Sequence, residues 1–198
     1  MLGEVQNLGD EFTAYILNPN SSKPLTVEKN DNVIISSKTS RAEQIWKFFR
    51  KKDGSYRIIN CETGKALDAG GTDGNIYTYE SCDNAWQSWY VFGTSDSYCL
   101  KSQATNEIIY IVGGNTEDGV NAQLYLPNGT PAQKFKIEKV DFYGDLNADG
   151  LINIKDLILF IKWFQNDETL IENYRAADID ENNIVNIVDF IMLKNLLI

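Results

Sequence analysis

A run of oxygen-bearing side chains lies near the C-terminal end of the chain, in the stretch DLNADGLINIKD at residues 145–156. A calcium ion takes roughly six to eight hard oxygen ligands, and a loop of about twelve residues offers them from alternate positions and from its last residue, around a turn residue at its centre. Gly150 stands at that turn. The ligand positions hold Asp145, Asn147, Asp149, Leu151 through its carbonyl, Asn153 and Asp156. This stretch therefore predicts a calcium site.

The same pattern returns 33 residues later, at residues 178–189. Asn183 replaces the glycine, and asparagine tolerates the left-handed backbone conformation that the turn requires. The ligand positions hold Asp178, Asp180, Asn182, Ile184 through its carbonyl, Asn186 and Asp189. Since two loops in register are poorly explained as chance acidic turns, the sequence predicts two bound Ca²⁺ ions.

Apolar residues at helical spacing follow each loop, which indicates a helix leaving each one. They are Leu157, Ile158, Phe160, Ile161 and Phe164 after the first loop, and Phe190, Ile191, Leu193 and Leu197 after the second. No amphipathic helix fits before Asp145, so each loop has an exiting helix without an entering one. Residues 168–177 are expected to form a short middle helix. Residues 141–198 thus predict a small all-α domain, in which calcium is a structural support rather than a signal.

A pair of such half-hands ending in Asp, opened by YGDLNADG and lying within residues 141–198, resembles the type I dockerin of cellulosomes. The resemblance implies a module that binds a cohesin domain of a scaffoldin, with calcium holding its loops and helices in shape. In that family the partner is recognised mainly at two pairs of positions per half. Here these positions hold Ile154, Lys155, Ile161, Lys162, Ile187, Val188, Lys194 and Asn195.

These eight residues depart from the Ser-Thr pairs of some well-known dockerins, so they do not assign a cohesin type. Ile154, Ile187 and Val188 either face a partner or are buried locally. The two halves also differ at Ile161 and Lys194, which leaves open whether the partner binds in one orientation or in two.

The first 140 residues consist of short β-branched and aromatic runs separated by turn residues, a pattern typical of an all-β domain. Several markers recur there in three units of roughly equal length. They are Asn18, Asn60 and Ser102; Leu25, Leu67 and Ile109; the turns Asp31-Asn32, Asp73-Gly74 and Asp118-Gly119; and the closing pairs Gln44 and Trp46, Gln87 and Trp89, and Gln133 and Phe135.

Three units that each end in Gln-x-aromatic resemble the ricin-B-like β-trefoil family of lectins and carbohydrate-binding modules. The resemblance covers residues 11–140 and implies that the closing aromatic residues meet near a pseudo-threefold axis, in a core that one unit could not bury alone. The alternative is an unrelated β-sandwich. The predicted architecture is therefore multidomain, with a β-trefoil at residues 1–140 and a small all-α dockerin at residues 141–198.

In that family each sugar site takes an Asp after the aliphatic marker, an aromatic residue past the turn, and often an Asn before the closing Gln. A carboxylate accepts hydrogen bonds from adjacent hydroxyls, and a ring stacks on the apolar face of a sugar. In successive units the three positions hold Thr26, Asp68 and Tyr110; Lys38, Glu80 and Tyr125; and Glu43, Trp86 and Ala132. No unit keeps the complete set.

The second unit places further rings close to Asp68 and Trp86, so a rearranged site is expected there. Alternation along a strand leaves Tyr77 and Tyr79 either buried or exposed. The candidate carbohydrate-binding residues are Asp68, Tyr79, Asn84, Trp86 and Tyr125.

Composition excludes several other functions. The net charge of -10 and the absence of a basic stripe argue against a nucleic-acid partner. The chain has no histidine, which excludes Ser-His-Asp and Cys-His catalysis. Carboxylates in the first 140 residues are scattered, so a glycosidase pair is not expected and the chain is predicted not to be an enzyme. A disulfide between Cys61 and Cys82 is open, with Cys99 left over.

The beginning of the chain has neither the basic nor the apolar region of a signal peptide, and no apolar run reaches the roughly 18 residues of a membrane span. The chain is therefore expected to be a piece of a longer secreted precursor. Its expected function is a non-catalytic, extracellular cellulosomal component that binds polysaccharide and a scaffoldin cohesin. The alternatives are a trefoil that binds protein or acts as a spacer, and the C-terminal fragment of a larger glycoside hydrolase.

Overall fold

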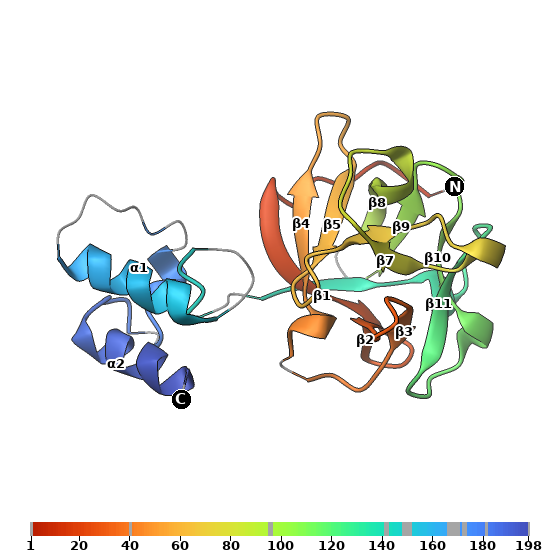
Figure 1. Ribbon diagram of the computed structural model, residues 1–198. Coiled ribbons are helices and arrows are strands. Elements are labelled where there is room, and N and C mark those ends of the chain that lie inside the picture. Colours follow the sequence, from red (N-terminus) through yellow and green to blue (C-terminus); the bar gives the residue numbers. More distant parts are fainter. Residues whose placement is uncertain are drawn as a thin grey trace. The chain divides into compact units, whose positions relative to one another are not determined.

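The computed structural model describes residues 2–39, 41–94, 97–140, 143–147, 152–165, 171, 174–180 and 182–197. The chain divides into two compact units, residues 1–140 and residues 141–198 (Figure 1). We describe each unit by itself.

The described residues of the first unit form twelve strands, joined by short 3-10 turns. The strands are β1 (Glu11–Asn18), β2 (Lys23–Val27), β3 (Val33–Ile35), β4 (Trp46–Arg50), β5 (Tyr56–Asn60), β6 (Ala66–Asp68), β7 (Tyr77–Tyr79), β8 (Trp89–Thr94), β9 (Ser97–Ser102), β10 (Ile108–Ile111), β11 (Val120–Tyr125) and β12 (Lys136–Lys139). The 3-10 turns are η1 (Ala42–Gln44), η2 (Thr72–Gly74), η3 (Ala85–Gln87), η4 (Val112–Gly114) and η5 (Pro131–Gln133).

Strand pairing closes six of these strands into a barrel. β1 pairs with β4, β4 with β5, β5 with β8 and β8 with β9, while β12 returns to pair with β1. A bridge between Tyr98 and Phe135 joins the third unit's first and last strands. The other six strands form three hairpins, β2–β3, β6–β7 and β10–β11. This arrangement of four strands per unit is a β-trefoil, which confirms the predicted fold and excludes a sandwich.

The closing aromatic residues lie in one shared core, as predicted. Trp46, Trp89 and Phe135 are fully buried and belong to a single apolar cluster. The indole nitrogen of Trp46 donates to the Leu25 carbonyl at 3.0 Å, and that of Trp89 donates to the Leu67 carbonyl at 2.9 Å. Each buried indole N–H therefore has an acceptor, which burial of its polar atom requires.

Buried asparagines join successive units at their ends. The amide of Asn60 donates to the Glu43 carbonyl at 3.1 Å, across the boundary between the first and second units. The amide of Asn18 donates to the Pro131 and Lys134 carbonyls at 3.1 and 3.0 Å, so the beginning of the first unit is joined to the end of the third. These bonds close the threefold arrangement on itself.

Three asparagines, one per unit, form a cyclic set of hydrogen bonds. Asn75 donates to Asn32 at 3.0 Å, Asn32 donates to Asn121 at 3.0 Å, and Asn121 donates to Asn75 at 2.7 Å. Each amide is thus both donor and acceptor, and the three units meet at this asparagine ring. Residues Asn32, Asn75 and Asn121 are all partly buried.

The asparagine ring corrects the alignment of the units inferred from sequence. That alignment matched Asn32 with Gly74 and Gly119, whereas the structure matches Asn32 with Asn75 and Asn121. The second and third units carry extra residues between the aliphatic marker and this position, in the loops that contain η2 and η4. Matching the acidic turn residues therefore displaced the alignment by one residue and then by two.

The cysteines of the described residues form no disulfide bond. Cys61 is buried at the end of β5 and Cys99 is buried within β9, whereas Cys82 is exposed. The bridge left open between Cys61 and Cys82 is not formed.

The described residues of the second unit form two α-helices, α1 (Ile154–Phe164) and α2 (Ile187–Leu196), each beginning within the last three residues of a predicted loop. Its buried core consists of Leu146, Phe160, Ala177 and Leu193. In the predicted middle helix, the described part contains one 3-10 turn, η6 (Tyr174–Ala177), and residues 168–170, 172 and 173 lie outside the description. Nowhere in the described chain does a helix have the length and apolar character needed to cross a membrane.

We predict that replacing one member of the asparagine ring destabilises the trefoil. Asn121→Ala removes the donor to Asn75 and the acceptor for Asn32, which leaves two partly buried amides without their partners. The free energy of unfolding should fall by about 1–3 kcal/mol. Urea unfolding followed by the fluorescence of the buried Trp46 and Trp89 measures this change.

The matched control is Glu117→Ala, an exposed position in the same unit, which should change stability by less than about 0.5 kcal/mol. Equal effects of the two substitutions would show that the ring contributes nothing to the fold.

Candidate functional site

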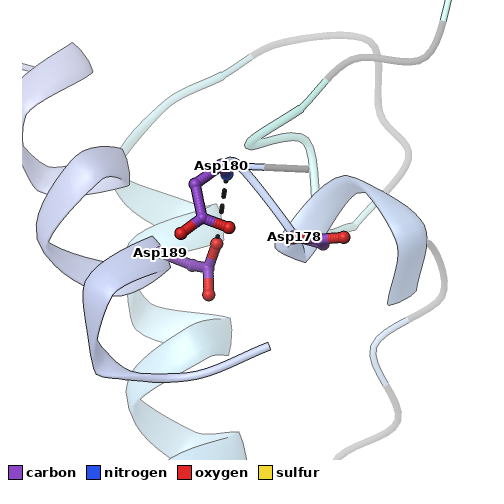
Figure 2. A group of neighbouring side chains, drawn as sticks. All are labelled: Asp178, Asp180 and Asp189. Carbon is purple, nitrogen blue, oxygen red and sulfur yellow. Dashed lines mark hydrogen bonds between the residues drawn. The ribbon is translucent and has the colours of Figure 1, made fainter. Parts of the chain in front are cut away.

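Three carboxylates converge in the second loop. Oxygen atoms of Asp178, Asp180 and Asp189 all lie within 4.8 Å of one another (Figure 2). Asp189 comes from the first turn of α2, and the other two come from the loop that precedes that helix. Three like charges at this spacing repel one another, and a hard cation that accepts oxygen ligands relieves the repulsion. This arrangement is suited to holding a divalent cation.

Asp189 also fixes the loop to the helix. Its side chain is fully buried. One oxygen accepts the backbone N–H groups of Ile179 at 2.8 Å and Asp180 at 3.3 Å, and the other accepts that of Asn186 at 2.8 Å. Figure 2 shows the bond from Asp180. A single carboxylate therefore satisfies three backbone donors that neither a helix nor a strand satisfies.

Asp156 has the same role in the first loop. It is fully buried, and its two oxygens accept the N–H groups of Leu146 at 3.0 Å, Asn147 at 3.3 Å and Asn153 at 2.8 Å. Asp145 is also buried, with 2% of its surface exposed. The remaining predicted ligands of this loop, Asp149 and Leu151, lie outside the described residues.

The other predicted ligands of the second loop hold its turn in place. Asn183 adopts a positive φ of 66°, as predicted from its place at the turn. The Asn182 side chain accepts the Ile184 N–H at 2.8 Å, and the Asn186 amide donates to the Ile184 carbonyl at 3.0 Å. Asn186 also caps α2 by accepting the Val188 N–H at 2.8 Å, and Asn153 caps α1 in the same way.

The helices of the second unit expose apolar side chains to solvent. All eight residues that sequence assigned to partner binding are exposed. Ile154, Ile187 and Val188 have 61%, 56% and 47% of their surface accessible, which contradicts the alternative of local burial. Sequence reasoning missed Ile158 and Ile191, which are 47% and 50% exposed. Their spacing of four residues from Ile154 and Ile187 was the available signal.

In the first unit, Asp68, Tyr77 and Trp86 converge around Gly70. A Cβ atom at Gly70 would lie 2.9 Å from an Asp68 oxygen, 3.6 Å from the Tyr77 hydroxyl and 3.8 Å from the Trp86 ring. Asp68 is held by the Gly70 N–H at 2.7 Å and by the Gln87 amide at 2.8 Å. A side chain at Gly70 would collide with Asp68, so glycine is required for this close approach to the fixed carboxylate.

Aromatic rings surround this carboxylate. Tyr79 and Trp86 are 55% and 45% exposed, and the Tyr77 ring lies 6.0 Å from that of Tyr79. Burial raises the pKa of Tyr77, and the charge of Asp68 raises it further, so its hydroxyl keeps its proton and can donate to a ligand. Tyr77, Gly70 and Gly71 line a cavity of about 480 Å³.

Asn84 supports the loop rather than facing this space. Its side-chain oxygen accepts the Gln87 N–H at 3.0 Å and caps η3, while its amide contacts the Cys82 sulfur at 3.0 Å. Asn84 therefore positions the loop that carries Trp86.

Strand pairing corrects the aromatic position assigned from sequence. Leu67 lies opposite Thr78, and Ile109 lies opposite Leu124, so Tyr79 is the counterpart of Tyr125. Lys38 and Glu80 do not occupy this position, because the extra loop residues displaced the alignment. The second repeat of the trefoil therefore keeps both the carboxylate, Asp68, and the aromatic ring, Tyr79.

The third unit keeps an aromatic surface without a carboxylate. Tyr125 is 48% exposed, and its ring centroid lies 5.2 Å from that of Tyr110, which occupies the carboxylate position. In the first repeat of the trefoil the carboxylate position holds Thr26, whose hydroxyl is hydrogen-bonded to Ser36 at 2.8 Å. The second repeat of the trefoil thus has the most complete set of sugar-site residues of the three repeats.

Comparison with known families finds two matches in order along the chain. The model described as "Ricin-type beta-trefoil lectin domain-like" matches residues 5–79 and 85–145, and "Dockerin type I domain" matches residues 143–198. No curated protein matches the sequence.

Several solved structures share the fold of the first unit. The designed threefold-symmetric protein ThreeFoil is 24% identical, with a TM-score of 0.61, covering 65% of this chain and 99% of its own. An exo-β-1,3-galactanase from Clostridium thermocellum is 23% identical, with a TM-score of 0.61, covering 69% of this chain and 31% of its own. A ricin B-like lectin from Macrolepiota procera, solved with lactose, is 18% identical, with a TM-score of 0.59, covering 68% of this chain and 100% of its own.

We predict that Asp189→Ala exposes the backbone of the second loop. It removes the acceptor for three N–H groups, so amide hydrogen exchange at Ile179 and Asn186 should accelerate at least tenfold in calcium-containing buffer. NMR detection resolves these amides individually.

Asp180→Ala is the matched control, because it removes a carboxylate of the same cluster but leaves the Asp189 carboxylate that accepts these three N–H groups. If both variants accelerate exchange equally, the hydrogen bonds to Asp189 are not what holds the loop.

Proposed function

Because the chain belongs to the family of ricin-type β-trefoil lectin-like domains and ends in a type I dockerin domain, we propose that it binds polysaccharide through the trefoil and a scaffoldin cohesin through the dockerin. The observation that carries this proposal is the presence of both modules in one chain. A lectin-like module and a dockerin are both non-catalytic, and no catalytic domain is seen in this chain. We place the protein outside the cell, as a secreted component of a cellulosome.

Dockerin domains generally bind calcium, and we assign one Ca²⁺ ion to each loop. The clustered Asp178, Asp180 and Asp189 support the second site, and the matching hydrogen bonds of Asp156 support the first. The proposed ligands are Asp145, Asn147, Asp149, Leu151, Asn153 and Asp156 in one loop, and Asp178, Asp180, Asn182, Ile184, Asn186 and Asp189 in the other.

Calcium is proposed to support the structure of the dockerin. The core of this unit contains few fully buried side chains, so apolar burial alone supplies little stability. Binding of an ion to ligands that are dispersed in the unfolded chain adds its binding free energy to folding.

The exposed residues of α1 and α2 are the proposed cohesin-binding surface. Apolar side chains alternate there with lysines, a composition suited to an interface with an apolar centre and a polar rim. The surface consists of Ile154, Lys155, Ile161, Lys162, Ile187, Val188, Lys194 and Asn195, together with Ile158 and Ile191.

The second unit of the trefoil is the proposed main sugar site. The Asp68 carboxylate would accept sugar hydroxyls, and Tyr79 and Trp86 would stack on the apolar faces of the rings. Asn84 contributes by holding the loop, and Tyr125 offers a second, weaker stacking surface in the third unit.

A second candidate function is a trefoil that contacts protein or acts as a spacer. The incomplete sugar sites of the first and third trefoil repeats favour this second function, because neither repeat combines a carboxylate with an exposed ring at the family's positions. A third candidate is the C-terminal fragment of a larger glycoside hydrolase, and it is favoured by the match to the galactanase, which covers only 31% of that enzyme.

We predict that the protein is retained on at least one of xylan, galactan, starch and cellulose, and that Asp68→Ala and Trp86→Ala each weaken this binding by tenfold or more. A loss of about 1.4 kcal/mol corresponds to tenfold. Pull-down isotherms on the insoluble glycans measure the affinity.

Tyr174→Ala is the control. It removes a comparably exposed aromatic ring from the dockerin, outside the trefoil, and should leave retention unchanged. Absence of retention on every glycan, with cohesin binding intact, would favour the spacer or protein-binding function.

We predict that cohesin binding requires both calcium and the exposed isoleucines. Ile154→Asp with Ile187→Asp places charges on both helices and should weaken binding to a type I cohesin panel at least a hundredfold, measured by calorimetry. Chelation should abolish binding and reduce the helical signal in circular dichroism.

Leu126→Asp adds a single negative charge at an exposed apolar position of the trefoil and serves as the control. Helices that persist fully in chelator would refute the proposed role of calcium.

A further inference from the structure

A basic cavity lies at the turn of the hairpin formed by β4 and β5, and none of the residues that line it was assigned to a site above. Its volume is about 590 Å³. It is lined by Phe49, Arg50, Lys51, Lys52, Asp53, Arg57 and Asp83. Four basic and two acidic residues give this lining a charge of +2, in a chain whose net charge is -10. The cavity is therefore a local exception to the acidity of the protein.

Arg57 presents a guanidinium group at this cavity, and its charge helps to lower the pKa of Asp83. Its carbon Cζ lies 5.5 Å from the centre of the Phe49 ring, and the two residues are directly opposite each other in the strand ladder. None of the described carboxylates lies within the 4.0 Å of an ion pair with Arg57, and its buried Nε has no hydrogen-bond partner there. A guanidinium is a planar fork of N–H donors, which suits the two oxygens of a carboxylate.

Lys51 is already paired at the edge of the cavity. Its Nζ lies 2.6 Å from Asp83 and donates to the Ser88 hydroxyl at 2.8 Å. The hydrogen bond from Lys51 lowers the pKa of Asp83, so this carboxylate remains charged near neutral pH. Asp83 is thus the built-in competitor of any anion that enters.

The turn that carries these charges is held by its own hydrogen bonds. The N–H of Lys51 donates to the Ser55 carbonyl at 2.7 Å, and Gly54 adopts the positive φ of 84° that the turn requires. Asp53 accepts the Ser55 N–H at 3.0 Å and the Gln103 amide at 3.1 Å. The basic side chains therefore project from a fixed frame, which lowers the entropic cost of binding.

We propose that this cavity binds the carboxylate of a uronic acid residue in a sparsely charged polysaccharide. One planar carboxylate matches one guanidinium fork, whereas the net charge of -10 repels a densely charged polyanion. Asp83 lies three residues from Trp86 on the loop before β8, so the cavity neighbours the proposed sugar site. The inference rests on the proposed function only in taking a polysaccharide as the natural ligand.

The first test compares a glucuronic acid-bearing xylan with the same xylan after reduction of its carboxyl groups. The wild-type protein should bind the acidic form at least tenfold more tightly, and Arg57→Gln should remove this preference. Arg41→Gln makes the same charge change at an exposed position outside the cavity and should keep this preference. Asp83→Asn should strengthen binding of the acidic form about threefold, because Lys51 is released.

The second test uses free glucuronate, with glucose as the neutral probe. Glucuronate should shift the NMR signal of the Arg57 side chain and glucose should not. Arg57→Lys, which keeps the charge without the fork, should weaken binding of the acidic xylan by an intermediate factor. Near-ultraviolet circular dichroism checks that each variant is folded.

Each failure has a separate signature. If none of the glycans tested, the two xylans included, binds but glucuronate shifts Arg57, the proposed polysaccharide function fails and the carboxylate site stands. If glucuronate produces no shift, or if the two xylans bind equally, the carboxylate site is wrong even when neutral glycans bind. Dextran sulfate binding as tightly as the acidic xylan would also overturn it, because the cavity would then act only as an ion exchanger.

Discussion

Both units depend on buried side chains that hydrogen-bond backbone groups lying outside regular strands and helices. In the trefoil, Gln44, Gln87 and Gln133 each accept an N–H from the loop before them and donate to a carbonyl of the same loop. In the dockerin, Asp156 and Asp189 each accept hydrogen bonds from three backbone N–H groups. A buried backbone donor without a partner costs about 1–3 kcal/mol, so these few residues determine whether the loops keep their shape.

The same buried residues position the candidate sites. Gln87 donates to Asp68 and also holds the loop that carries Trp86, so one amide orients both the carboxylate and the ring. Asp189 joins the beginning of its loop to the first turn of α2, which brings three carboxylates together. In each case the structural requirement and the chemical one fall on the same side chain or on its direct partner. A substitution there affects stability and binding together.

The sequence predicted the features that recur with a distinctive residue type. The closing aromatic residues, the helices that leave the loops and the left-handed Asn183 follow from spacing and residue type alone. The asparagine ring was missed, although its members are 43 and 46 residues apart, the same intervals that separate Trp46, Trp89 and Phe135. The repeats were aligned on acidic turn residues in loops of unequal length, which also concealed that Tyr79 corresponds to Tyr125. Hydrogen bonds across the axis and strand pairing show the correct alignment. The exposure of Ile158 and Ile191 likewise depends on how each helix packs.

The asparagine ring has a consequence for how the three repeats can change over evolutionary time. Each repeat contributes one side-chain amide to the asparagine ring, and the hydrogen bonds of the ring do not involve the sugar-site positions of that repeat. The repeats can therefore acquire loops of different length and different surface chemistry while the axis stays the same. This separation accounts for one chain holding a Thr-Ser pair, a carboxylate with rings, and a pair of tyrosines at three equivalent places. The trefoil thus combines one common core with three surface sites whose residues can vary independently.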